Sequence, residues 1–171
     1  MNIFHLDKDP LLCARYHCDK HVVKMILETA QMLSTAYQRH CGLDDNLYKP
    51  AYPHHPMTIW VGESIENYKY ALMLGTELGK EYTKRYKKIH KSSNIISLLR
   101  GIGRVWNVEN NFPSVNFTNP PLCMPDDCKR DCYIFSYRKY YKEYKSYFAK
   151  YNYSETPHWL KEVIDARWIY F

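Results

Sequence analysis

The sequence predicts an all-α protein, folded as a single compact domain over residues 1–171. Hydrophobic residues make up 46% and charged residues 25% of the chain, which are the values of a globular protein. Glycine is scarce, at 6 of 171 residues, and long segments lack both glycine and proline. Aromatic residues reach 16%, with 17 tyrosines. This balance suits packed helices with amphipathic aromatic faces better than a turn-rich β fold.

The first predicted element is a long helix over residues 10–40. Asp9 is a favourable N-cap, and Pro10 suits the first helical position. No glycine or proline follows until Gly42, which predicts the end of the helix. Residues 42–56 contain three prolines and predict a loop. A second long helix follows over residues 57–91, where three glycines mark weak points or points of close packing.

The second half of the chain predicts shorter elements. Ser92 or Ser93 can cap a short third helix that reaches residue 99. Residues 101–127 are rich in Gly, Asn and Pro and predict a long ordered loop, a kind of segment that is often functional in a compact domain. A fourth helix is expected over residues 127–151, and a last one over residues 158–170. The sequence thus predicts a bundle of about five helices.

The net charge of +6 is concentrated in two segments. Residues 80–91 contain six Lys or Arg and one acidic residue, and residues 129–150 contain seven Lys or Arg and two acidic residues. Both segments interleave these charges with tyrosine, which is typical of surfaces that contact phosphates and stack on bases. We therefore expect an anionic partner, with nucleic acid first and DNA ahead of RNA. The alternative is a pair of solvated helix faces whose lysine stems cover tyrosines.

The first helix has two contrasting faces at 100° per residue. One face is expected in the core and contains Val22, Val23, Ile26, Ala30, Leu33 and Tyr37. The opposite side is a polar stripe of His17, His21, Lys24, Glu28 and Gln31. Two histidines, a lysine and a carboxylate at spacings of three and four can hold or move protons, which predicts a catalytic site. The alternative is an ordinary polar outer face.

We expect neither a metal nor a cofactor. His17 and His21 could ligate zinc from adjacent turns, but the glutamate of zinc proteases is replaced by Cys18. Cys123, Cys128 and Cys132 lack the paired CxxC spacing of a zinc ribbon, so ordinary reduced thiols are the favoured interpretation and structural zinc the alternative. Gly101-Ile102-Gly103-Arg104 is neither a dinucleotide-binding motif nor a P-loop. The chain also has no Gly-x-Ser-x-Gly motif of a serine hydrolase.

Further residues are candidates for contact with nucleic acid. His55 precedes a predicted helix whose free N–H groups favour anions, and Trp60 could stack on a base. Basic residues of the two charged segments are the other candidates. The predicted phosphate or base contacts are His55, Trp60, Arg85, Lys88, His90, Lys91 and Arg138.

No membrane or export signal is expected. The sequence has no run of 18 apolar residues, and MNIFHLDKDP lacks the basic and apolar regions of a signal peptide. We expect an intracellular protein in the cytoplasm or nucleus of a host cell. The oligomeric state is not predicted.

Two resemblances follow from the motifs. LDKDPLLCARYHCDKHVVKMILETAQMLSTA, with YKP, HHPMTIW, ENYKY, EYTKRYKKIHKS and CMPDD, resembles a family of small uncharacterised proteins of phages and large DNA viruses over most of the chain. The layout is more distantly similar to the pyrimidine-dimer DNA glycosylases (endonuclease V), which are compact, basic and all-α. That second resemblance implies a DNA N-glycosylase and lyase with a terminal-amine nucleophile, assisted by a glutamate on the first helix.

The chain departs from that glycosylase family at both catalytic positions. Its second residue is Asn2, whose size usually prevents removal of the initiator Met. Lys24 stands where an ungapped pairing expects the glutamate, with Glu28 one turn later. The hypothesis is therefore that Lys24 attacks the sugar, Glu28 stabilises the developing positive charge, and His17 or His21 carries the proton. The alternatives are a non-enzymatic module that binds DNA or RNA, an N-glycosidase acting on free nucleotides, and a protein that binds a host protein.

Overall fold

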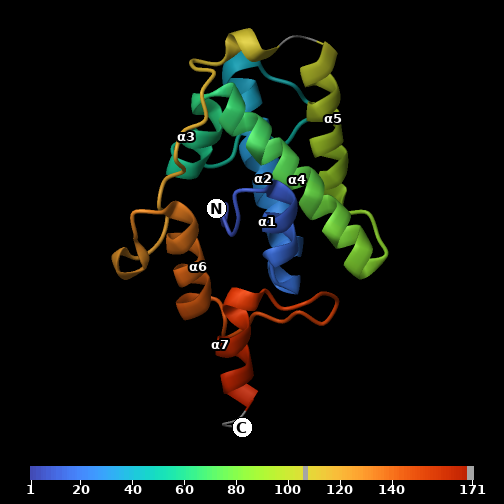
Figure 1. Ribbon diagram of the computed structural model, residues 1–171. Helices are drawn as coiled ribbons and strands as arrows, with labels where there is room; N and C mark the ends of the chain where they lie inside the picture. The colour runs from blue at the N-terminus through green and yellow to red at the C-terminus, as the bar shows by residue number, and fades with distance from the viewer. Residues whose placement is uncertain (106–107, 169–171) are drawn as a thin grey trace.

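The computed structural model describes residues 1–105 and 108–168, and over these residues the protein is all-α, as predicted (Figure 1). The described α-helices are α1 (Pro10–Tyr16), α2 (Asp19–Cys41), α3 (Pro56–Glu63), α4 (Ile65–Tyr86), α5 (Lys91–Val105), α6 (Tyr133–Tyr144) and α7 (His158–Trp168). Two short 3-10 helices are η1 (Val108–Asn111) and η2 (Asp126–Cys128).

Helix α2 lies at the centre of the bundle, where it packs against α3, α4 and α5 (Figure 1). Helix α1 packs on α4, while α6 contacts η2 and α7 in the other half of the molecule. The first nine residues run between these two halves (Figure 1). There Ile3 and Leu6 are fully buried, so the start of the chain is part of the core.

The predicted first helix is broken at residues 17 and 18, which are both extended. Asp9 caps α1 and Gly42 ends α2, as predicted. Tertiary contacts stabilise the break, because the backbone polar groups of residues 17 and 18 form hydrogen bonds with distant elements. The Cys18 N–H donates to the Tyr141 hydroxyl at 2.9 Å, and Arg85 Nη1 donates to the His17 carbonyl at 2.8 Å. No local glycine or proline signals it.

The predicted second helix is also two helices. Ser64 is extended and accepts a hydrogen bond from the Asn67 N–H at 3.1 Å, so it caps α4 where α3 has ended. Helix α4 ends at Tyr86, five residues before the predicted end, with Lys87 in the left-handed region. At Gly75 an added Cβ would lie 2.9 Å from Ile96 Cδ1, so this glycine permits the close packing of α4 on α5.

The second half of the chain contains more helix than predicted before residue 106. After that residue it contains less helix than predicted. Helix α5 begins at Lys91 and continues to Val105, so the expected loop over residues 101–127 begins with helix and also contains η1 and η2. Helix α6 is shorter than the expected helix over residues 127–151. Helix α7 begins at His158 as predicted, and residues 169 and 170 of its expected end lie outside the described residues.

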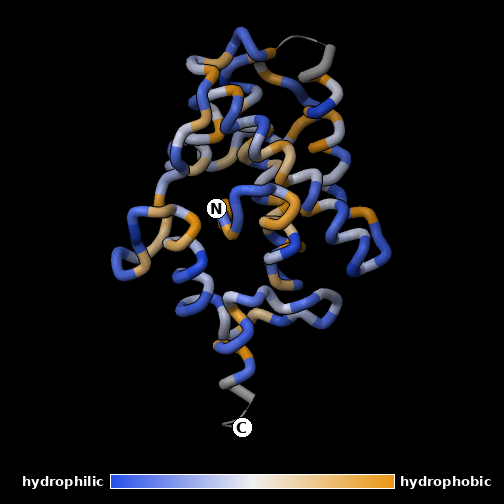
Figure 2. Tube along the Cα trace, in the orientation of Figure 1, coloured by the Kyte–Doolittle hydropathy of each residue, from blue (hydrophilic) through white to orange (hydrophobic). Residues whose placement is uncertain are grey.

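Hydropathy alternates along the helices, with apolar and hydrophilic residues interspersed (Figure 2). Accordingly, none of the helices within residues 1–105 and 108–168 is long and apolar enough to cross a bilayer.

Candidate functional site

The predicted Lys24–Glu28 pair forms one cluster with the first two residues of the chain. Lys24 Nζ lies 3.3 Å from Glu28 Oε1. On the other carboxylate oxygen, the Asn2 N–H donates to Glu28 Oε2 at 2.8 Å, and the Met1 nitrogen lies 3.8 Å away. The Glu28 side chain is 11% exposed, whereas the Lys24 side chain is 62% exposed. One nearly buried carboxylate thus has three nitrogen atoms around it, and one of them belongs to an exposed lysine side chain.

Asn2 holds the start of the chain in place. Its Nδ2 donates to the Cys123 carbonyl at 3.0 Å, and its Oδ1 accepts from the Tyr137 hydroxyl at 3.2 Å. These bonds hold the backbone beside Glu28 against the loop before η2 and against α6. His55, a predicted phosphate contact, lies near this cluster. Burial lowers the pKa of His55, the Met1 amino group lowers it further, and Glu28 opposes both effects.

Two further lysines belong to this region. Lys20 lies on α2, and Lys145 directly follows the end of α6. Lys20 Nζ lies 5.0 Å from the centre of the Phe148 ring, and Phe148 contacts His21 with ring centres 5.1 Å apart. Lys145 Nζ lies 4.6 Å from the centre of the Tyr140 ring. Burial lowers the pKa of His21 most, followed by the charge of His17 and then by those of Lys145, Lys24 and Lys20. Lys20 lies one turn before Lys24 and two turns before Glu28 on α2, and we call Lys20, Lys24 and Lys145, with the rings under Lys20 and Lys145, the lysine surface.

The two histidines of the predicted stripe are buried rather than part of an outer face. His17 is fully buried, with Nδ1 2.7 Å from the Cys13 carbonyl oxygen. His21 is 5% exposed, with Nδ1 2.9 Å from the Tyr141 hydroxyl. Burial lowers the pKa of His17 to about 4 and that of His21 to about 2. Neither imidazole is accessible enough to support the predicted role of proton carrier.

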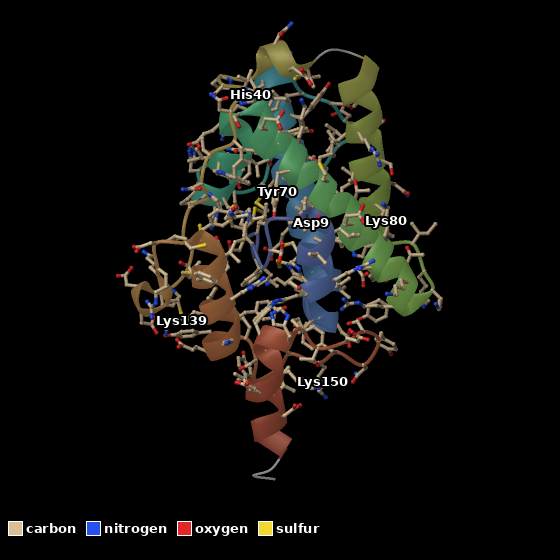
Figure 3. All side chains as sticks on the ribbon, in the orientation of Figure 1. Asp9, His40, Tyr70, Lys80, Lys139 and Lys150 are labelled. Atoms are coloured by element: carbon tan, nitrogen blue, oxygen red, sulfur yellow. The ribbon has the colours of Figure 1, made fainter. Side chains whose placement is uncertain are left out.

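A third buried histidine, which sequence reasoning did not select, lies beyond these two. His5 is fully buried among aromatic rings, stacked on Tyr70 with ring centres 5.1 Å apart and edge-on to Trp60 at 5.2 Å. Tyr70 lies in the middle of the molecule (Figure 3). Within the described residues, neither ring nitrogen of His5 has a hydrogen-bond partner. Burial and the nearby His17 lower the pKa of His5 to about 3.

Arg85 is a structural residue, which corrects its assignment as a phosphate contact. Its side chain is fully buried and pairs with Asp19 at 3.2 Å and with Glu81 at 3.1 Å. It also donates to the carbonyls of Arg15 and His17, which α1 leaves open at its end. With four hydrogen bonds in the core and a fully buried side chain, Arg85 is unavailable to a ligand.

Trp60 and Arg138 are likewise engaged within the protein. Trp60 is 2% exposed and donates Nε1–H to the Thr118 carbonyl at 3.0 Å, so it cannot stack on a base. Arg138 donates to the Leu6 carbonyl at 2.8 Å and pairs with Asp7 at 2.9 Å. Both residues instead fix the first nine residues and the segment before η2.

Three of the remaining predicted phosphate contacts are not brought to Glu28. Lys88, His90 and Lys91 lie at the turn between α4 and α5, away from the chain start (Figure 1). Lys88 and Lys91 are exposed, while His90 is half-buried, which lowers its pKa. His55 accepts the Met57 N–H at 3.2 Å through Nδ1 and caps α3.

The three C-terminal cysteines do not form a common metal site. All six cysteines of the chain are free. In the part of the chain that the structure describes, the one group of three potential ligands is Asp127, Cys128 and Glu143, whose ligand atoms lie within 4.8 Å of one another. Two of these residues are exposed carboxylates, and the Cys128 thiol, whose pKa is raised to about 11 mainly by burial, donates to Glu143.

Sequence reasoning missed Met1, Asn2, Lys20 and Lys145 as members of the site. Lys20 precedes Lys24 by one turn and could have been found from helical spacing. The others required knowledge of how the first residues and α6 pack on α2. Comparison with protein-family models, with characterised proteins and with solved structures finds no match, so the case for function rests on geometry.

Proposed function

We propose that this protein is a nucleic-acid-processing enzyme of the N-glycosylase and lyase type, acting through Lys24 and Glu28. The observation that carries this proposal is the arrangement at Glu28: a carboxylate with 11% of its side chain exposed, beside a solvent-exposed primary amine at 3.3 Å. An amine nucleophile beside a fixed carboxylate is the machinery for attack on a sugar carbon that develops positive charge.

The chemistry needs only these two groups and water. Lys24 must first lose a proton, and Glu28 Oε1 is an acceptor within 3.3 Å. The amine then attacks C1′ of a nucleotide, forming a C–N bond, while the bond from C1′ to the base breaks and its electron pair leaves with the base. The departing base takes up the second amine proton through water, and Glu28 returns its proton to O4′ as the sugar ring opens, which leaves a protonated Schiff base beside the restored carboxylate. Water then hydrolyses the Schiff base, or Glu28 removes a proton from C2′ and the C3′–O bond breaks, so that β-elimination releases the 3′ phosphate.

The neighbouring lysine surface supports a polynucleotide substrate. Lys20 and Lys145 lie over aromatic rings near Lys24, at 5.0 and 4.6 Å from the ring centres. Lysines neutralise backbone phosphates, so this surface suits a strand with several phosphates. DNA is the expected substrate, as the resemblance to the glycosylases implies, and an intracellular location in a host cell is part of this proposal. His17 and His21 have only a packing role in it.

Borohydride trapping on undamaged, UV-irradiated, uracil-containing and abasic duplexes tests the chemistry. Borohydride reduces a Schiff base to a stable covalent adduct. We expect an adduct with wild-type protein on at least one duplex, and its loss in Lys24→Ala. Lys88→Ala, which removes an exposed lysine at the α4–α5 turn, is the matched control and should retain the adduct.

The Met1 nitrogen, 3.8 Å from Glu28, is the other amine at this carboxylate. A protein acetylated at Met1 separates the two amines. If acetylation abolishes trapping and Lys24→Ala does not, the assignment of Lys24 is wrong. If neither change has an effect, no amine at Glu28 is the nucleophile and the enzyme proposal fails.

A non-enzymatic nucleic-acid-binding module is the second candidate, favoured by the lysine and aromatic surface around Lys20 and Lys145. This function does not require Glu28. It predicts a salt-sensitive mobility shift on all four duplexes, with no adduct and with binding unchanged in Glu28→Gln. Absence of both adduct and shift would instead favour an N-glycosidase acting on free nucleotides.

A further inference from the structure

A cleft distinct from the Glu28 site lies where α1, α4 and α7 meet. Its volume is about 730 Å³, and its walls are the end of α1, the second half of α4, the loop of residues 154–157 and the first turns of α7. This volume is within the range of pockets that bind small organic molecules, about 300–1,000 Å³. A lone inorganic anion would fill only a small part of it.

The cleft carries an excess of positive charge from three elements. Arg15, Lys84 and Lys161 line it. Arg15 Nε lies 3.9 Å and Lys84 Nζ 4.0 Å from the Glu81 carboxylate, while both cationic side chains are more than half exposed, at 53% and 64%. Glu81 is already paired at 3.1 Å with a buried arginine on its own helix. One carboxylate is thus shared among three cations, which leaves Arg15 and Lys84 able to bind an anion from solution.

Polar and apolar groups complete the lining. The Ser154 hydroxyl is buried at the cleft and has no hydrogen-bond partner among the described residues. Leu12, Tyr16 and Pro157 supply an apolar portion, and the imidazole of His158 lies beside Tyr16, with ring centres 6.4 Å apart. An apolar and aromatic portion beside a cluster of cations suits a ligand that joins a flat ring to a charged phosphate.

We propose that this cleft binds a nucleoside phosphate through Arg15, Lys84 and Lys161. The ligand is a free mononucleotide or the 5′-terminal nucleotide of a strand, since both present the same phosphate, sugar and base. The cations bind the phosphate, and the base lies on the apolar portion.

One acidic residue of the cleft allows a test in which binding should become stronger instead of weaker. Glu155 lines the cleft and is exposed to solvent. Its charge opposes a phosphate, although solvent and salt screen it. Removing this charge should strengthen binding, whereas removing Arg15 or Lys161 should weaken it.

Calorimetric titration with adenosine 5′-monophosphate, with adenosine and with inorganic phosphate is the experiment. We expect the monophosphate to bind at least about tenfold more tightly than adenosine, the ratio that one charge-assisted contact provides. Arg15→Gln and Lys161→Gln should each weaken its binding by about twofold to fivefold, as for exposed ion pairs. Glu155→Gln should strengthen it, and Lys88→Gln, outside the cleft, should leave it unchanged.

Two further arms identify the source of the ligand and separate this site from the Glu28 site. A 5′-phosphorylated oligonucleotide that competes with the monophosphate, when its 5′-hydroxyl counterpart does not, indicates a strand end; no competition indicates the free nucleotide. Lys24→Ala should leave monophosphate binding unchanged, so loss of adduct formation does not affect this result. The proposal is overturned if the monophosphate binds no better than adenosine, or if Arg15→Gln and Lys161→Gln both bind it as wild type does.

Discussion

Three buried histidines make the stability of this protein depend on pH just below neutrality. Burial lowers the pKa of His5 to about 3, of His17 to about 4 and of His21 to about 2. In the unfolded chain the same side chains have a pKa of about 6.5. At neutral pH both states are largely unprotonated and the folded state is fully stable. As pH falls below 6.5, the unfolded chain binds protons that the folded protein cannot accept, so stability is lost.

The magnitude follows from proton linkage. At pH 5.5 an unfolded histidine is about nine-tenths protonated, whereas the three buried ones remain neutral. Each then costs a little over 1 kcal/mol between pH 7.0 and 5.5, and together about 4 kcal/mol of unfolding free energy. Because these side chains are at most 5% exposed, solvent screening does not reduce the effect. Total domain stability is about 5–15 kcal/mol, so the loss is a large fraction.

Urea unfolding at pH 7.0 and 5.5, followed by circular dichroism, measures this difference. Carboxylates titrate mainly below this interval, at a pKa of about 4, so histidines dominate the change. His5→Phe keeps an aromatic ring and removes two buried nitrogens that have no partner among the described residues. This variant should be at least as stable as wild type at pH 7.0 and should lose about one third less stability at pH 5.5.

His54→Gln, which replaces an exposed histidine, is the control for the substitution itself. Equal stability at the two pH values, within about 1 kcal/mol, would refute the assignment of three neutral buried histidines. A loss in His5→Phe as large as that of wild type would show that His5 accepts a proton in the folded protein.

Three further predictions concern the ends of the helices and the packing between them, and each is measured by urea unfolding. Arg85→Met should destabilise the protein by about 3–5 kcal/mol, because two carboxylates of the core lose their shared cation. Gly75→Ala should cost about 1–3 kcal/mol, since the new Cβ would lie 2.9 Å from Ile96 Cδ1, while relief of that contact by Ile96→Val should recover part of the loss. Ser64→Ala should cost about 1 kcal/mol by leaving the Asn67 N–H without its cap, and a stability unchanged from wild type would show that the cap is dispensable.

Local signals predicted the helices well where a helix begins or ends by its own chemistry. The Asp9 cap and the Gly42 stop are both present, and His158 begins α7. The break between α1 and α2 has no such signal. The Tyr141 hydroxyl and Arg85 stabilise the extended residues of this break through hydrogen bonds, and they lie 123 and 68 residues away along the chain. Local sequence patterns do not predict contacts between residues so far apart.

The candidate site was predicted in part for the same reason. Helical spacing correctly joined Lys24 to Glu28, which are one turn apart. It also placed the whole polar stripe on the side of the helix opposite the core, whereas His17 and His21 are buried. Phe4 stacks on His21 at 4.7 Å, and Tyr141 hydrogen-bonds it from α6, so two distant segments cover a polar side of α2. Val23, expected in the core, is 38% exposed.

Burial of arginine also changes what the charge distribution predicts for nucleic-acid binding. Arg85 and Arg138, one in each basic segment, bind acidic side chains within the protein, which leaves mainly lysines outside.

If Lys20, Lys24 and Lys145 neutralise three phosphates of duplex DNA, the logarithm of affinity should fall with the logarithm of salt concentration at a slope of about −3. Fluorescence anisotropy between about 50 and 200 mM salt measures this slope. Lys20→Ala should reduce it by about 1, whereas Lys88→Ala should not. A wild-type slope of about −6 or steeper would mean that further cations also contact DNA, and the lysine surface would then be only part of the binding face.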